Sequence, residues 1–157
     1  MNVELALRSK SEAKLPLDGK VALVTGGGRD IGQACALSLA AKGASVAVSY
    51  HSSAQGADRT VAQIQEAGGR AMAVGAALSK PASAEAFVSA VIAEYGHIDT
   101  LVNNTGGLVA RKTMEEMELA DWQAVMDLNL TSVFTMTKAC LPHLRERGCI
   151  VNLARLA

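Results

Sequence analysis

The stretch TGGGRDIG, from Thr25 to Gly32, decides how this chain is expected to fold. It follows the apolar run VALV (21–24), and the residues after it, Ile31 to Lys42, place their apolar side chains at helical spacing. A strand that passes through a glycine-rich turn into a helix directs free backbone N–H groups and the positive end of the helix dipole at an anion. The stretch therefore predicts a phosphate-binding turn, and the alternative is a turn that is only structural.

The composition favours a sheet that is buried on both faces. Hydrophobic residues make up 50% of the chain but aromatic residues only 3%, so the core must consist mainly of Ala, Val, Leu, Ile and Met. Such aliphatic cores are usual for parallel sheets covered by helices. The formal net charge is zero and the basic residues are dispersed, which argues against a nucleic-acid partner. No apolar run reaches the roughly 18 residues of a membrane span, so no membrane partner is expected either.

The cysteines and histidines do not form a metal-binding pattern. Cys35, Cys140 and Cys149 are odd in number and lack ligand spacing, so they are interpreted as reduced, mostly buried thiols of a cytoplasmic protein. The histidines are scattered as well, and no metal site is expected. Residues 1–14 carry scattered charges and no signal-peptide core, which predicts a flexible N-terminal extension.

Strand and helix patterns alternate along the rest of the chain. Strands are expected at residues 21–25, 45–50, 70–74, 100–103 and 149–153, and helices at 31–42, 54–67, 84–95 and 119–147. The last helix is expected to break near Asn129 and to kink or end at Pro142. Short connections between alternating strands and helices predict right-handed βαβ units, and hence a Rossmann-type doubly wound parallel sheet in a three-layer α/β/α arrangement. Ligands of such sheets bind beyond the carboxyl ends of the strands, where Gly26, Asn104 and Asn152 are expected.

Four motifs in this order resemble the short-chain dehydrogenase/reductase family, and within it the 3-oxoacyl-carrier-protein reductase-like members. TGGGRDIG matches the family's T-G-x-x-x-G-x-G turn except at one glycine, and DTLVNNTG (99–106) matches D-x-L-V-N-N-A-G except at Thr105. DLNLTSVF (127–134) contains an asparagine where the family has one on its long helix, and GCIVNLA (148–154) resembles the strand before the family's catalytic serine. The resemblance implies that residues 15–157 form a partial NAD(P)-binding Rossmann domain, in which the C-terminal strands of the family are missing.

The resemblance also implies which residues contact the cofactor. Those placed around the two turns are Gly26, Gly28, Ile31, Gly32, Asn104 and Gly106. Asn104 would lie along the ribose, with an Asx-type turn as the alternative. Asn129 would be catalytic and hold a water in a proton relay, and the alternative is a polar residue at a helix break. Asp99 and Asn103 would hold their strand against its neighbours.

Charge around the second expected strand favours NADP over NAD. NAD enzymes of this fold place an acid near the end of that strand, where it accepts hydrogen bonds from the ribose hydroxyls. No carboxylate occurs between Val48 and Ala57. Arg29, together with Ser52 and Ser53, is instead expected to bind the 2′-phosphate of NADP. The alternative is that Arg29 is a solvated loop charge.

Besides Thr105, three positions depart from the family pattern. Asp30 replaces a glycine; a carboxylate about 5 Å from a phosphate costs about 3 kcal/mol at an effective dielectric constant near 20, whereas one turned outward costs little. Ala77 replaces an aspartate that contacts the adenine. Arg155 aligns with the catalytic serine, and neither tyrosine of the chain is followed by lysine four residues later. The chain as given is therefore expected not to turn over substrate.

These observations lead to one main functional hypothesis and two rivals. The main hypothesis is NADP(H)-dependent hydride transfer to or from a small-molecule carbonyl or alcohol, by a 3-oxoacyl reductase-like oxidoreductase. The rivals are a catalytically dead nucleotide-binding or subunit-interaction module, and a non-catalytic structural fragment. The strand 149–153 is expected to be an exposed edge. The long helix 119–147 is expected to join copies of the chain in a homo-oligomer, through apolar residues that include Val133, Phe134, Met136 and Leu141.

Overall fold

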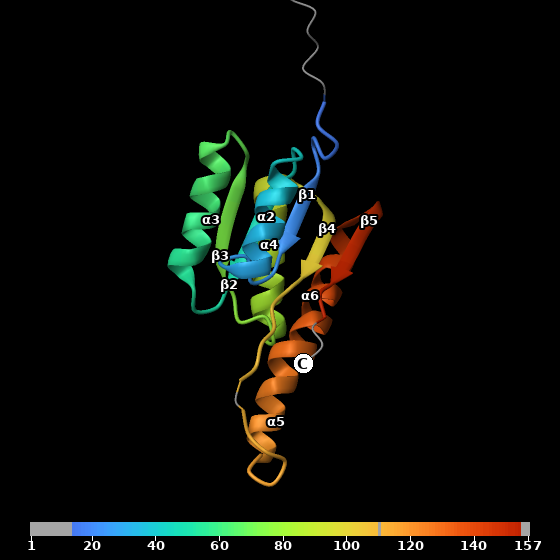
Figure 1. Cartoon of the computed structure of the whole chain (residues 1–157). Helices are drawn as coiled ribbons and strands as arrows, with labels where there is room; N and C mark the ends of the chain where they lie inside the picture. The colour runs from blue at the N-terminus through green and yellow to red at the C-terminus, as the bar shows by residue number, and fades with distance from the viewer. Residues whose placement is uncertain (1–13, 110, 155–157) are drawn as a thin grey trace, which may run out of the picture.

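Five parallel strands form the centre of the molecule (Figure 1). The computed structural model describes residues 14–109 and 111–154, so Arg155 and nearly all of the expected N-terminal extension lie outside the described residues. The strands are β1 (Val21–Val24), β2 (Ser45–Tyr50), β3 (Ala71–Gly75), β4 (Ile98–Asn103) and β5 (Leu144–Asn152). Their order in the sheet is β3-β2-β1-β4-β5, and every neighbouring pair is parallel. This arrangement confirms the predicted doubly wound parallel sheet.

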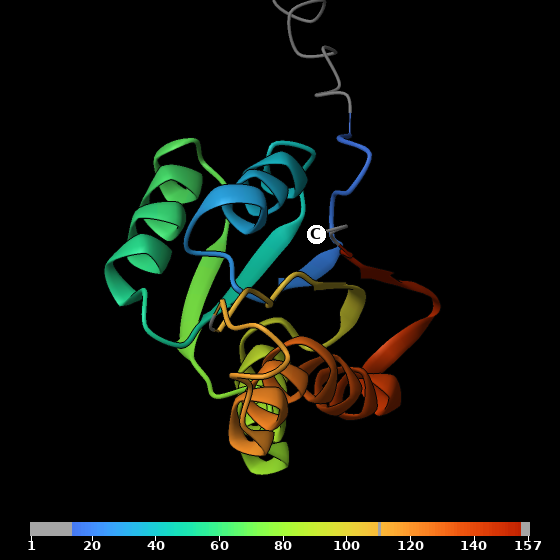
Figure 2. The ribbon, with the colours of Figure 1, turned by 60° about the horizontal axis from the view of Figure 1, so that its bottom comes forward.

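Helices cover both faces of the sheet, as Figure 2 shows. The helices α2 (Asp30–Ala40) and α3 (Ala54–Glu66) pack on one face, and α4 (Pro81–Tyr95) and α6 (Ser132–Cys140) pack on the other. Along β1, Val21 and Leu23 lie in the core under α4 and α6. Ala22 and Val24 lie in the core under α2 and α3. Because successive side chains of a strand point to opposite faces, the apolar run 21–24 contributes to both cores, and the three-layer prediction is confirmed.

The C-terminal part differs from the prediction of one helix from residue 119 to 147. α5 (Leu119–Met126) continues through a π-helical turn (Asp127–Thr131) into α6, which ends at Cys140. A 3-10 turn then spans Leu141–His143, and β5 begins directly after it. The helix stops here because Pro142 has no N–H to donate and its ring clashes with the preceding turn. The first half of β5 carries exposed charges at residues 145–147, so no apolar alternation marks it as a strand.

The three thiols occupy different environments. Cys140 is buried, and this burial raises the pKa of its thiol to about 12. Cys149 is exposed on the edge strand β5, so the expectation of a mostly buried set is wrong for this residue. Across the described part of the chain, no group of three or more metal-ligating side chains comes together, and no helix is long and apolar enough to cross a membrane.

Asp99 of β4 holds the start of β1 by hydrogen bonds. Its carboxylate accepts a hydrogen bond from the backbone N–H of Val21 at 2.9 Å and pairs with Lys20 Nζ at 3.0 Å. His97 Nε2 lies 3.0 Å from the same carboxylate. Burial alone would raise the pKa of Asp99, but the hydrogen bonds from Val21 and Lys20 outweigh it and hold this pKa below its usual range. The expected role of Asp99 in holding the strands together therefore has a direct structural basis.

An Asp99→Asn variant is expected to lose about 2 kcal/mol of unfolding free energy at pH 7, because the negative charge is lost and the amide NH2 meets another donor, either Lys20 Nζ or the backbone N–H of Val21. A carboxyl whose pKa is lowered by folding stabilises the native state above its unfolded pKa, near 4, and this stabilisation is lost as the pH falls through the folded pKa. The difference between wild type and variant should therefore shrink below about pH 4. Urea unfolding at several pH values measures it, with the exposed Asp58→Asn as the control. A difference that stays constant down to pH 3 contradicts this assignment.

Candidate functional site

The glycine-rich turn at the carboxyl end of β1 packs its two ends directly against each other. Gly26 has a φ of +66°, in the left-handed region that favours glycine. A Cβ on Gly32, in the first turn of α2, would lie 2.2 Å from the carbonyl oxygen of Gly26. It would also lie 2.5 Å from the side-chain nitrogen of Asn104. The turn therefore requires glycine at both positions, as a backbone that closely approaches a phosphate group would.

Asn104 joins this turn to the carboxyl end of β4. Its side-chain Nδ2 donates to the carbonyl oxygens of Thr25 at 2.9 Å and of Gly26 at 3.2 Å. The Thr25 hydroxyl oxygen accepts hydrogen bonds from the backbone N–H groups of Asn104 and Thr105, each at 2.9 Å. β1 and β4 are neighbours in the sheet although β2 and β3 lie between them in the chain, so the strand order reverses at this point. Ligands of doubly wound sheets bind in the crevice at such a reversal.

Asn129 lies in the π-helical turn between α5 and α6, so the α-helical pattern is interrupted at the predicted position although the helix itself continues. Its Oδ1 accepts a hydrogen bond from the N–H of Gly107 at 2.9 Å, and its Nδ2 donates to the carbonyl oxygens of Gly107 at 3.0 Å and Val125 at 2.9 Å. A Cβ on Gly106 would lie only 2.8 Å from the same Oδ1. These contacts bring Asn129 to the loop that follows β4, beside Gly106. Single π-helical turns of this kind occur frequently at functional sites.

The residues predicted for the 2′-phosphate surround the other end of the turn. A Cβ on Gly28 would lie 3.1 Å from the carbonyl oxygen of Ser53, which precedes α3. Ser53 thus lies against the residue that precedes Arg29 in the chain. Ser52 is exposed, the Arg29 side chain is 80% exposed and Ile31 is 53% exposed, so all three remain open to a ligand.

Asp30 has an unusual backbone conformation for a residue with a side chain. Its φ of +50° is left-handed, and it is the one non-glycine residue with a positive φ in the described part of the chain. Left-handed backbone costs roughly 1 kcal/mol in most residues, although aspartate tolerates it better than most. The carboxylate is 82% exposed and lies 3.7 Å from Arg29 Nε. The Asp30 carboxylate therefore lies beside the Arg29 guanidinium, the group that is expected to bind the cofactor phosphate.

Three residues position the turn through contacts that were not predicted from the sequence: Thr25, Gly56 and Thr60. Thr25 is the first residue of the turn motif, but its contacts could not be predicted, because its bonds to residues 104 and 105 connect segments 79 and 80 residues apart. Gly56 carries a detectable signal, because a glycine in the first turn of a helix lowers helix stability unless its small size is needed. Thr60 carries no such signal, since a threonine inside a helix is unremarkable in sequence.

A glycine-rich turn at the reversal of a parallel sheet defines a nucleotide-binding site of the Rossmann type. The family model of short chain dehydrogenases matches residues 20–157, so the chain belongs to this family. The resemblance stated from the motifs is thereby confirmed.

Relatives and solved structures agree with this assignment. A 3-oxoacyl-[acyl-carrier-protein] reductase from Synechocystis is 44% identical over 144 residues, which cover 90% of this chain and 58% of the reductase. A short chain dehydrogenase from Burkholderia cenocepacia, solved in complex with NADP, matches with a TM-score of 0.83 and 40% identity, over 87% of this chain and 55% of that one. An NADH-dependent reductase responsible for alginate metabolism matches with a TM-score of 0.81 and 36% identity, over 87% of this chain and 58% of that one. The chain thus spans about half the length of the curated relatives it matches.

Proposed function

We propose that this chain forms the NADP(H)-binding part of an oxidoreductase that transfers a hydride to or from a small-molecule carbonyl or alcohol, in the manner of 3-oxoacyl reductases. The observation that carries the proposal is the tight turn at the strand reversal, which requires glycine at positions 26 and 32 and leads into the N-terminus of α2, where Arg29 makes no side-chain capping hydrogen bond. Gly26, Gly28, Ile31 and Gly32 would hold the pyrophosphate, and Asn104 and Gly106 the ribose beside the nicotinamide. Bound NADPH would supply the hydride.

The choice of NADP over NAD depends on the corner formed by the turn and the end of β2. Arg29 extends into solvent there, Ser53 lies against Gly28, and no carboxylate occurs from Val48 to Ala57. A 2′-phosphate would meet a guanidinium and two hydroxyls, which are suitable donors for it. Of the two similar structures described above, one is a complex with NADP and the other is an NADH-dependent reductase. The preference for NADP must therefore be argued from the residues of this corner.

We expect NADPH to bind more tightly than NADH, and Arg29→Ala to lower that preference about tenfold, the loss of one charge-assisted hydrogen bond. Fluorescence titration of both cofactors measures the preference. Arg147→Ala, an exposed arginine on β5 at the far edge of the sheet, is the control and should leave it unchanged. Equal affinity for both cofactors in the wild type would contradict the 2′-phosphate assignment.

Asp30 is expected to weaken cofactor binding. Asp30→Gly and Asp30→Asn should each strengthen NADPH binding about tenfold if repulsion by the carboxylate is the cause, because tenfold corresponds to about 1.4 kcal/mol. Asparagine retains the tolerance for left-handed backbone and removes only the charge. Improvement in the glycine variant alone would instead identify the backbone as the cause. Unchanged dissociation constants in both would show that the turn has adapted to the acid.

Asn129 is proposed as the catalytic residue that this chain contributes, held beside Gly106 by its three hydrogen bonds. Neither Tyr50 nor Tyr95 is followed by lysine four residues later. We therefore propose that these 157 residues alone bind the cofactor without turnover. A nucleotide-binding or subunit-interaction module without catalysis is the second candidate, and Arg155, at the position of the family's catalytic serine, favours it. Measurable NADPH oxidation with a ketone would contradict both this candidate and the proposed lack of turnover.

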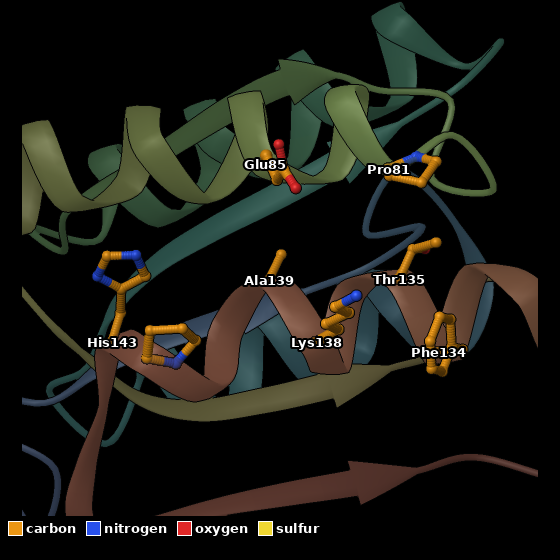
Figure 3. Close-up of a pocket in the computed structure, with 8 residues that line it drawn as sticks. Pro81, Glu85, Phe134, Thr135, Lys138, Ala139 and His143 are labelled. Atoms are coloured by element: carbon orange, nitrogen blue, oxygen red, sulfur yellow. The ribbon is translucent and has the colours of Figure 1, made fainter.

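We also propose that copies of the chain associate through α5 and α6, in the cytoplasm. α5 has no buried residue, and Figure 1 shows it extending away from the sheet. Phe134 and Leu141 are 63% and 56% exposed, as expected, and Val133 is half-buried. Met136 was expected at the same surface but is fully buried in the core under α6, because it lies on the face of the helix that covers the sheet. Phe134 also lines a hollow of about 350 Å³ between α4 and α6, which Glu85 faces from α4 (Figure 3).

A further inference from the structure

The glycine-rich turn touches the first turn of α3 through backbone atoms. A Cβ on Gly56 would lie 2.3 Å from the carbonyl oxygen of Gly28 and 2.5 Å from the hydroxyl oxygen of Ser53. A Cβ on Gly28 would lie 2.9 Å from the backbone nitrogen of Ala57. Neither glycine can therefore carry a side chain unless the turn and the helix move apart.

Thr60, one turn further along α3, holds the same contact with a side chain. It is fully buried, and its hydroxyl lies 3.0 Å from the carbonyl oxygen of Gly27 and 3.1 Å from that of Gly56. A threonine inside a helix commonly bonds to the carbonyl four residues earlier, which here is Gly56. The additional acceptor, Gly27, belongs to the glycine-rich turn. The single hydroxyl proton is shared between the helix and the turn, so this side chain links the two segments.

We propose that Gly56 and Thr60 are positioning residues for the 2′-phosphate of NADP(H). Arg29 directly follows Gly28, and Ser53 directly precedes α3, so the contact at Gly56 sets the distance between the guanidinium and the serine. The inference rests on the proposed function, because it assigns to these residues the spacing of the groups that would bind the phosphate. If the turn moves away from α3, NADPH loses a contact that NADH never makes. The two residues should therefore act on the preference between the cofactors more than on binding in general.

The test compares three variants in titrations with NADPH and with NADH. Gly56→Ala is expected to lower the preference for NADPH about tenfold, and Thr60→Val severalfold, by misplacing one or more charge-assisted hydrogen bonds. Thr60→Ser retains the hydroxyl and should restore the wild-type preference. Gln55→Ala, at an exposed position of the same helical turn, should also leave the preference unchanged. In the absence of cofactor, amide hydrogen exchange at residues 27–29 should be faster in Thr60→Val than in Thr60→Ser.

The outcomes separate this inference from the function on which it rests. If the wild type binds neither cofactor, the proposed function is wrong and the inference fails with it. If the wild type prefers NADPH but Thr60→Val and Thr60→Ser keep the same preference, only the inference is overturned. The same holds if the variants weaken both cofactors by equal factors, since that is what a purely structural role produces. Should Gly56→Ala not fold, the Thr60 pair decides by itself.

Discussion

A Gly32→Ala variant is expected to lose measurable NADPH binding and about 2–3 kcal/mol of unfolding free energy, the usual range for overpacking a tight contact. The new methyl group would lie 2.2 Å from a backbone oxygen, that of Gly26, and 2.5 Å from the amide nitrogen of Asn104. A backbone oxygen cannot rotate away as a flexible side chain can. The turn must therefore open, and Asn104 must lose its bonds to Thr25 and Gly26.

The sign of the change in unfolding free energy distinguishes the effect of the close contact from that of helix propensity. In a helix that is free of contacts, alanine is more stable than glycine by about 1 kcal/mol, so propensity alone predicts that the variant gains stability. Urea unfolding and NADPH titration measure the two effects. Gly107→Ala is the matched control, because its Cβ would meet only Leu128 Cδ2, at 3.9 Å. A Gly32→Ala protein that is as stable as the wild type would show that the close contact is not required.

The second large effect concerns association. Large apolar side chains are exposed at intervals of three, four, seven or eight residues from α5, through the π-helical turn and α6, to the 3-10 turn. They are Leu119, Trp122, Leu130, Phe134 and Leu141, with exposed fractions of 80%, 49%, 57%, 63% and 56%. These intervals place residues on one face of a helix, and burying each such side chain contributes about 1.5–3 kcal/mol. The double variant Trp122→Glu/Phe134→Glu is therefore expected to shift an associating chain to monomer.

Light scattering coupled to size-exclusion chromatography, at several protein concentrations, measures this shift. Gln55→Glu adds a charge at an exposed position on the opposite face of the sheet and should leave the association unchanged. The rival surface is the free side of β5, where Val151 is 42% exposed and unpaired backbone groups can bind another strand. If the double variant still associates while Val151→Lys, which places a charge on the exposed edge strand, is monomeric, the contact is the strand edge. A wild type that is monomeric at all concentrations would contradict both.

The strands that can be predicted accurately from the sequence are those that are buried on both faces of the sheet. β1 and β2 are predicted to within a residue, because both lie inside the sheet and consist of apolar or small residues between clear turn signals. The start of β5 is not predictable in this way. Residues 145–147 are charged and exposed, and they lie in an irregularity of the ladder, between the pair Leu144–Ile98 and the pair Cys149–Thr100 that β5 makes with β4. An edge strand depends on its neighbour more than on its own side chains.

For the candidate site, the residues can be predicted from the sequence but their contacts cannot. The glycines of the turn, Asn104 and Asn129 can be named from the sequence, because each belongs to a short motif that resembles one of the family. Their contacts cannot be deduced from sequence, since Asn129 bonds to Gly107 and Asn104 bonds to Thr25 across the chain. The left-handed φ of Asp30 is likewise set by the turn that encloses it, while the residue type alone favours a different conformation.

The hydrogen bonds that hold the two ends of β1 have a consequence for folding during synthesis. The backbone of β1 is held at its start by Asp99, which binds Val21, and just past its end by Asn104, which binds Thr25. The partners are 78 and 79 residues apart in the chain. At the usual 5–20 residues per second, a ribosome needs about 4–16 s after it completes β1 to release the residues that secure it. Throughout that interval the apolar run 21–24 lacks its β4 neighbour, and nascent chains should bind chaperones most strongly before Asn104 emerges.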